Sequence, residues 1–294
     1  MWRNKKSLFL ILPALMVTTV LFFGGLWEGF VQSISIHGPT QEGKFTLEYY
    51  KDILSSLDFW YYLFFTLRIA FITTVLCTMV SIIVLYLLFW MRSYGSSLEG
   101  WAKKFFEIPM LFPYVVAAYM IFLIFSPSGW LSRILYNLGM IDAMEQFPIL
   151  VNDSFGWGII LAYVWKMSPF MVVMLYPLLL KIEKNWLDVG RVLGASKIAF
   201  FKEVVFPMLV DPLKIIIFIV FSYSLLDYEI PYMLGVTYPK TLSVASYQLY
   251  MNGALSDRSK ALAIYILSTM LVVLHGIVFY FVTKKNRGRK RQKI

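Results

Sequence analysis

The stretch Asp188–Pro207, DVGRVLGASKIAFFKEVVFP, mixes charged and apolar residues and lies between two long apolar segments of the chain. An apolar stripe at helical spacing leads into it, formed by Trp186, Val189, Val192 and Leu193. Gly194 interrupts this pattern, and Ser196 is a residue type that caps helix N-termini. The stretch is therefore predicted to form two short helices around a glycine turn, outside the lipid.

A second apolar stripe follows the turn and comprises Ile198, Phe201, Val204 and Val205, before Pro207 leads towards the next apolar segment. Two helices this short cannot bury both stripes against each other. One stripe can pack beneath the membrane helices, which leaves the other available to a partner protein, as in helix-in-groove recognition. The alternative is a loop that lies at the membrane surface without a partner.

The composition indicates a membrane protein. Apolar residues make up 59% of the 294 positions and charged residues 15%, whereas soluble domains carry about 25% charged residues. Six apolar segments are long enough to cross a bilayer, which takes roughly 20 helical residues: Ser7–Val31, Tyr62–Trp90, Phe105–Ser126, Phe155–Leu180, Leu209–Leu234 and Ala261–Val282. The predicted fold class is an all-α integral membrane protein with six transmembrane helices.

The distribution of basic residues predicts the orientation. With the N-terminus in the cytoplasm, 18 Lys and Arg residues fall in inner segments and six in outer ones. Because inner loops carry the positive excess, both termini are predicted to be cytoplasmic. This orientation also puts Asp188–Pro207 in the cytoplasm, between the fourth and fifth spans. The basic tail is expected to lie against anionic lipid headgroups rather than nucleic acid.

No change in composition divides the chain, so a single transmembrane domain over residues 1–294 is predicted, with a core at about 59–283. The cytoplasmic loop covers 183–208 and the basic tail 284–294. The first span is interpreted as a retained anchor, because it is longer than a signal-peptide core and no small-residue cleavage site follows it. Two outer connections contain helical patterns: FTLEYYKDIL ahead of the second span, and WLSRILYNLGMI after the third.

Charged residues within the spans are candidates for a solute pathway, because each costs about 2.5–3.5 kcal/mol on insertion scales. Asp227 and Glu229 lie in the fifth predicted span. Two carboxylates there could line a pathway and favour a cationic solute. The alternative is that they lie near water in the outer half of the membrane, where they hydrate or pair with Arg68. Lys166 in the fourth span is either a pathway residue or the partner of another charge.

The sequence contains no GxxxxGK[ST] phosphate loop, no Cys/His cluster and no nucleophile–base pair. The single cysteine, Cys77, lies within a predicted span. We therefore expect a chain that performs no catalysis and holds no metal or cofactor.

The stretch resembles the EAA loop of permease subunits in binding-protein-dependent ABC importers. That family pattern is Glu-Ala-Ala, three variable positions, Gly-Ala, and later a Phe and a Pro. The matching positions here are Asp188, Val189 and Gly190 for the triplet, then Gly194, Ala195, Phe201 and Pro207. Asp replaces Glu at the first position, and neither Ala of the triplet is present.

The resemblance implies a pore formed by two permease subunits above two ATPase subunits, which bind the ATP. The loop then forms a coupling helix seated on an ATPase, and an extracytoplasmic binding protein delivers the solute at a bacterial or archaeal cytoplasmic membrane. The loop residues implied in docking are Asp188, Gly190, Gly194, Ala195, Ser196, Phe201 and Pro207. The sequence leaves open whether the second permease is a copy of this chain or a relative.

The sequence LGAS at Leu193–Ser196 resembles the corresponding sequence of permeases for polyamines, ferric iron, sulfate or phosphonates. Sugar permeases usually have DGA at this place. The acidic residues of the fifth span weigh against sulfate. A cationic solute such as a polyamine or ferric iron is therefore expected, and a sugar-type permease is the alternative. A stand-alone secondary transporter is a further alternative, although the six spans show no obvious inverted repeat.

Overall fold

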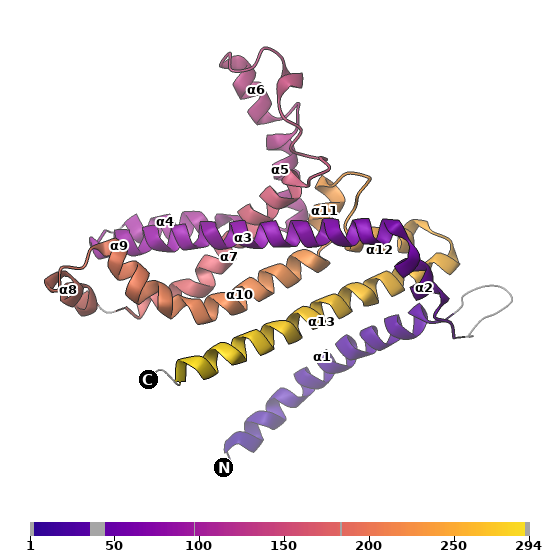
Figure 1. Ribbon diagram of the computed structural model, residues 1–294, viewed down its shortest axis with the longest axis horizontal. Coiled ribbons are helices and arrows are strands. Elements are labelled where there is room, and N and C mark those ends of the chain that lie inside the picture. Colours follow the sequence, from indigo (N-terminus) through magenta and orange to yellow (C-terminus); the bar gives the residue numbers. More distant parts are fainter. Residues whose placement is uncertain (1–2, 36–44, 97, 183, 292–294) are drawn as a thin grey trace. The chain divides into compact units, whose positions relative to one another are not determined.

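The computed structural model describes residues 3–35, 45–96, 98–182 and 184–291, and in these ranges the chain forms helices joined by turns (Figure 1). The α-helices are α1 (Arg3–Ser33), α2 (Glu48–Ser55), α3 (Leu57–Ser93), α4 (Leu98–Glu107), α5 (Tyr114–Phe125), α6 (Trp130–Asn137), α7 (Trp157–Leu180), α8 (Lys184–Val192), α9 (Lys197–Phe200), α10 (Phe206–Leu226), α11 (Glu229–Leu234), α12 (Leu242–Asn252) and α13 (Leu255–Arg291).

Six stretches of the described chain are long and apolar enough to cross a membrane, which confirms the predicted number. They are Ile11–Ser33, Leu57–Ser93, Tyr114–Asn137, Trp157–Leu180, Lys197–Leu226 and Leu255–Lys284. The two helical patterns predicted in the outer connections also form helices, α2 and α6. Lys284 to Arg291 of the basic tail continue α13, and residues 292–294 lie outside the described residues.

The contacts divide the chain into two units. The first contains Met1–Tyr61 and Leu242–Leu271, and therefore α1, α2, α12 and the first part of α13. Hydroxyl groups hold its connections together: Ser259 Oγ donates to the Ser35 carbonyl at 3.0 Å, and Ser246 Oγ to the Ala261 carbonyl at 2.8 Å. The prediction of a single domain with a core at about 59–283 stays a prediction.

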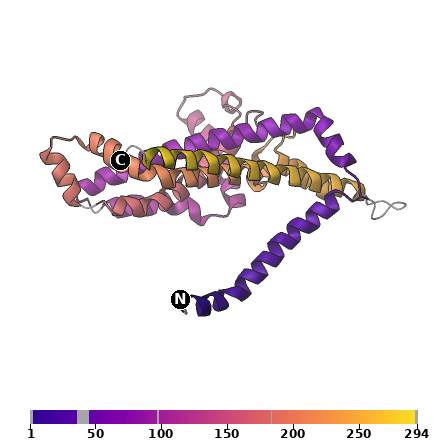
Figure 2. The same ribbon diagram turned by 60° about the horizontal axis from the view of Figure 1, so that its bottom comes forward.

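The second unit contains Tyr62–Thr241 and Val272–Ile294, and it holds the main apolar core. Within it α3, α7 and α10 run side by side (Figures 1 and 2). In an apolar stretch of 18 residues within each span, 67% of the residues are buried in α7, against 33% in α3 and 28% in Lys197–Leu226, which contains α10. The central position of α7 explains why its apolar residues cover the whole circumference rather than one stripe.

The third span was predicted as one segment, Phe105–Ser126, but the structure divides it. After α4 the chain forms a 3-10 turn at Ile108–Leu111, Phe112 is extended, and α5 begins at Tyr114. Pro109 and Pro113 explain the break, because neither has an N–H to continue an α-helix. With only 12 residues, α5 reaches about 18 Å, which is short of the hydrocarbon thickness.

The fifth span, predicted as Leu209–Leu234, is divided as well. The α10 helix ends at Leu226, Asp227 is extended with ψ 136°, and α11 begins at Glu229. The break lies four residues before Pro231, whose missing N–H would have bonded the carbonyl of Asp227 in a continuous helix. Pro231 therefore breaks the helix one turn before its own position.

Candidate functional site

The loop around Asp188–Pro207 forms the two helices and the turn that the sequence predicts. Gly194 has a φ of +78°, a left-handed conformation that favours glycine. The N–H of Ala195 bonds the carbonyl of Gly190 at 2.9 Å, which closes the end of α8 around this residue as in a Schellman motif. Ser196 then caps α9, because its hydroxyl accepts from the N–H of Ala199 at 3.2 Å. The predicted glycine turn and N-cap are confirmed.

Most of the second apolar stripe of the loop packs on the end of α3, whereas its first residue, Ile198, is 65% exposed. Phe201 and Val205 are buried. The ring of Phe200 stacks on Phe89 with centroids 6.1 Å apart, and Phe201 meets Tyr86 at 5.1 Å. From Phe201 the chain continues through a π-helical turn into α10. The loop is therefore joined rigidly to two spans, α3 by packing and α10 by continuity.

The first apolar stripe stays exposed. Val192 is 87% exposed and Leu193 80%, while Trp186 and Val189 are also exposed. A groove of about 270 Å³ lies between α8 and the start of the next helix, lined by side chains of both. The lining includes Trp186, Val189, Leu193, Ala199, Phe200, Glu203 and Val204. Such an apolar surface beside a rigid turn can receive or enter a partner protein.

The remaining loop candidates lie around this surface. Asp188 is exposed and lines a hollow of about 410 Å³ together with Arg92 and Tyr94 at the end of α3. Pro207 occupies the first turn of α10, where its missing N–H costs nothing. Gly190 permits the close approach of α8 to Phe200, because a Cβ there would lie 2.8 Å from Cδ2 of that ring.

Three of the four pathway candidates lie at the two helix breaks of the second unit: Asp227 and Glu229 at one, and Lys166 at the other. The carboxylate of Asp227 accepts the hydroxyl of Tyr163 at 2.8 Å and that of Tyr223 at 3.5 Å. It also accepts the N–H of Ile230 at 3.4 Å, so it caps the start of α11. Glu229 lies in the first turn of α11, where the helix dipole favours a negative charge.

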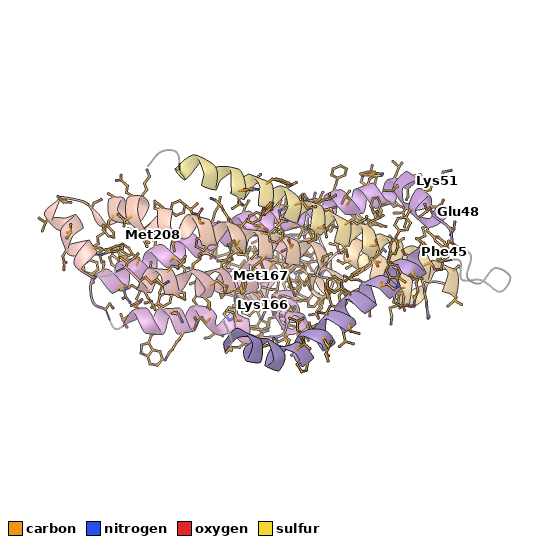
Figure 3. The ribbon with its side chains drawn as sticks, turned by 90° about the horizontal axis from the view of Figure 1, so that it is seen from below. Phe45, Glu48, Lys51, Lys166, Met167 and Met208 are labelled. Carbon is orange, nitrogen blue, oxygen red and sulfur yellow. The ribbon has the colours of Figure 1, made fainter. Side chains whose placement is uncertain are left out.

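Lys166 lies at the other break. It is 6% exposed, and its ammonium donates to the carbonyls of Pro109 at 2.9 Å, Met110 at 3.1 Å and Phe112. Figure 3 shows Lys166 and Met167 among the helices of this unit. A cavity of about 230 Å³ borders Lys166. Its other lining residues are Met110, Tyr114, Met167, Phe170, Ile219, Val220 and Tyr223.

Arg68 belongs to α3, and its side chain contacts the turn before α7. Its Nη2 donates to the carbonyls of Ser154 and Phe155, each at 3.0 Å, and its guanidinium lies 4.6 Å from the centre of the Phe155 ring. The carboxylate of Asp153 accepts three backbone N–H groups of the same turn. Arg68 therefore orders the entry to α7 through backbone contacts. Among the described residues, no group of three or more His, Cys, Asp or Glu is arranged to hold a metal ion.

Sequence reasoning missed the three tyrosines that connect these groups. Tyr163 is fully buried and bonds Asp227, while Tyr114 and Tyr223 stack with centroids 5.0 Å apart. A signal was present, since Tyr223 precedes Asp227 by one helical turn and Tyr163 precedes Lys166 by three residues. The contact between Tyr114 and Tyr223, by contrast, depends on how α5 and α10 meet.

Comparison with known proteins identifies the family. Residues 88–291 match the family described as binding-protein-dependent transport system inner membrane component. The spermidine/putrescine transport system permease PotB of Escherichia coli K12 is 27% identical over 205 residues, which cover 68% of this chain and 66% of PotB. The trehalose/maltose transport system permease MalF of Thermococcus litoralis is 27% identical over 300 residues, which cover 96% of this chain and 95% of MalF.

Solved structures show the same fold. One chain of a bacterial ABC transporter involved in import of the acidic polysaccharide alginate superposes with a TM-score of 0.76, over 97% of this chain and 98% of that one, at 16% identity. A chain of a bacterial alginate transporter, in complex with its alginate pentasaccharide-bound periplasmic protein, superposes with a TM-score of 0.70. The match covers 97% of this chain and 98% of that one, at 17% identity. The chain thus belongs to the binding-protein-dependent transport system inner membrane component family, as a permease subunit of a type I ABC importer.

The packing of Gly190 generates a stability prediction. Phe200 is 7% exposed and stacked on Phe89, so it cannot retreat from a new methyl group. We expect Gly190→Ala to destabilise the fold by about 1–3 kcal/mol through overpacking, and to lower the midpoint of thermal unfolding of the purified protein. Gly100→Ala in α4 is the matched control, since a Cβ there meets nothing within 4 Å. Equal midpoints for the two variants would contradict the proposed contact.

Proposed function

We propose that this chain forms half of the pore of an ATP-driven solute importer and receives mechanical work through α8 and α9. The observation that carries the proposal is the exposed apolar stripe of α8 beside the Gly194 turn. The stripe is joined to the spans on both sides, because α8 follows α7 and α9 continues into α10. A partner that moves this surface therefore moves two core helices together.

The partners follow from the family. Two ATPase subunits bind and hydrolyse ATP, and closure of this pair displaces the docked loops. The chain itself performs no catalysis and binds no cofactor in this scheme. A second permease subunit, either a copy or a relative, completes the pore. An extracytoplasmic solute-binding protein delivers the solute, as the complex of the alginate transporter with its periplasmic protein illustrates for a chain of the same fold.

The orientation belongs to the same proposal. Both termini and the α8–α9 loop lie in the cytoplasm of a bacterial or archaeal cell, and the six spans cross its cytoplasmic membrane. The distribution of Lys and Arg supports this arrangement, with 18 in the inner segments and six in the outer ones.

We further propose a cationic solute. Asp227 is half-buried beside tyrosine rings, and a carboxylate with aromatic faces suits an ammonium group. The three donors of Lys166 are occupied by carbonyls, so this residue has no free donor for an anion. PotB, named for spermidine and putrescine, is among the relatives. A sugar is the alternative, favoured by the match to MalF along 96% of this chain and by the aromatic cavity lining.

The orientation can be tested on Val192, the most exposed residue of the stripe. We expect Val192→Cys to react with a membrane-impermeant maleimide in inside-out vesicles. It should not react in cells whose outer envelope is permeable to the reagent but whose cytoplasmic membrane is intact. The native Cys77 is fully buried and leaves the background low. A cysteine in the outer connection, at Leu138, is the control with the opposite pattern. Labelling of Val192→Cys from outside would refute the orientation and the docking role together.

ATPase docking can be tested at Gly194. Arginine in a left-handed conformation costs about 1–2 kcal/mol and adds bulk to the docking surface. We expect Gly194→Arg to leave the subunit in the membrane but to abolish co-purification of the ATPase. The control is Gly194→Asn, because asparagine tolerates this conformation at helix ends, and it should retain the ATPase. The surface around Gly194 is open, so the effect on the chain itself is local. Unchanged co-purification of the arginine variant would count against docking here.

The cationic pathway can be tested by removing charge without removing the cap. Asn at 227 keeps an oxygen for the N–H of Ile230, so the start of α11 is preserved. We expect Asp227→Asn combined with Glu229→Gln to lower uptake of radiolabelled spermidine about tenfold, as for loss of a charged hydrogen-bond partner, with assembly intact. Asp211→Asn, at the Lys214 ion pair near the start of α10, is the control. Unchanged spermidine uptake would show that the two carboxylates have a structural role and do not bind the solute.

A further inference from the structure

The third span predicted from the sequence, Phe105–Ser126, is broken between α4 and α5. In an α-helix the carbonyl of Pro109 would accept the N–H of residue 113, which is a proline and has none. Met110 lies in the last turn of the 3-10 helix and Phe112 is extended, so the regular helical bonding stops at their carbonyls. Within the hydrocarbon, backbone polar groups need partners inside the protein. A group from another helix must therefore complete this segment.

Lys166 of α7 supplies that group. An ammonium has three donors, and all three carbonyls accept from it. The negative end of the helical segment before the break also favours a cation at this place. The bonds join α7 to the junction between α4 and α5, and they use the full donor capacity of the side chain.

The second break, between α10 and α11, is held by a side chain from the same turn of α7 as Lys166. Tyr163 donates its hydroxyl to Asp227 at 2.8 Å, and this carboxylate caps α11. Because residues three apart lie on the same face of a helix, Tyr163 and Lys166 form one adjacent pair. The stack of Tyr114 on Tyr223 joins the two breaks directly, since one ring follows the first break and the other precedes the second.

We propose that Tyr163 and Lys166 are positioning residues that tie both broken helices to α7. The segments that border the 230 Å³ cavity, α5 and the end of α10, then follow α7 as one body. The inference rests on the proposed function in one respect: α7 leads into α8, so displacement of the docked loop reaches the cavity through this pair. Transport coupling depends on the two side chains although neither contacts the ATPase.

The test measures distances between spin labels in the assembled transporter in lipid nanodiscs. One pair joins α5 to α7 through Val115→Cys and Met174→Cys, and a second joins α11 to α7 through Tyr232→Cys and Met174→Cys. All three positions are exposed, whereas Cys77 is buried. In the otherwise unaltered chain, both distance distributions are expected to be narrow and to keep their means when ATP and vanadate are added.

Two variants separate the two ties. Lys166→Met should broaden the α5–α7 distribution, and Tyr163→Phe should broaden the α11–α7 distribution. Each should also reduce solute uptake per ATP hydrolysed about tenfold, as expected for loss of a bond to a charged group, with spermidine and maltose as the solutes assayed. Ser168→Ala is the matched control on α7, because that buried hydroxyl donates to Val164 of its own helix. It should change neither quantity.

The outcomes distinguish this proposal from the preceding one. If the ATPase co-purifies but the variants leave both distributions narrow, the ties are refuted while the importer function stands. If no ATPase associates, the proposed function fails, and the nucleotide-free distributions still decide whether the ties exist. A shift of either mean on ATP binding in the unaltered chain would also overturn the single-body proposal. Tyr163→Phe keeps the ring and shape, so it remains informative should Lys166→Met fail to fold.

Discussion

The structure depends on one constraint: a backbone polar group inside a membrane needs a partner from the protein. Helices meet this requirement alone, and four of the six spans are continuous helices that do so. The spans predicted as Phe105–Ser126 and Leu209–Leu234 do not, because Pro109, Pro113 and Pro231 remove donors. Their breaks persist because polar side chains from α7 and from the breaks themselves complete the hydrogen bonding.

This constraint explains why charged groups occur in the core of the second unit. An unpaired charge at this depth would be costly, yet Lys166 is buried with all three donors bonded to carbonyls, and Asp227 accepts two tyrosine hydroxyls and a backbone N–H. The same groups border the cavity or lie next to residues that do. The side chains that complete the broken helices therefore lie close to the cavity proposed as part of the solute pathway.

The loop between α7 and α10 combines close packing against the spans with an exposed apolar surface. Aromatic packing of Phe200 and Phe201 on α3 provides the rigidity, and the left-handed Gly194 turns α8 outward. The π-helical turn that leads into α10 leaves no flexible linker between loop and span. The exposed stripe of α8 is therefore rigidly attached to the spans, and we propose that a partner bound to the stripe moves them.

The sequence by itself determined the number of apolar spans, the two helices of the loop with their glycine turn and serine cap, and the presence of a helix at Trp130–Asn137. These features depend on local spacing and on the conformational preferences of single residues such as Gly194 and Ser196. Only the tertiary structure decided that the third and fifth spans are broken, that Lys166 completes one break, and that Tyr163 binds Asp227. Those contacts join residues more than fifty positions apart, and no local pattern specifies which helices meet. A lysine or aspartate in an apolar segment shows that a partner is required, but the packing of the helices selects it.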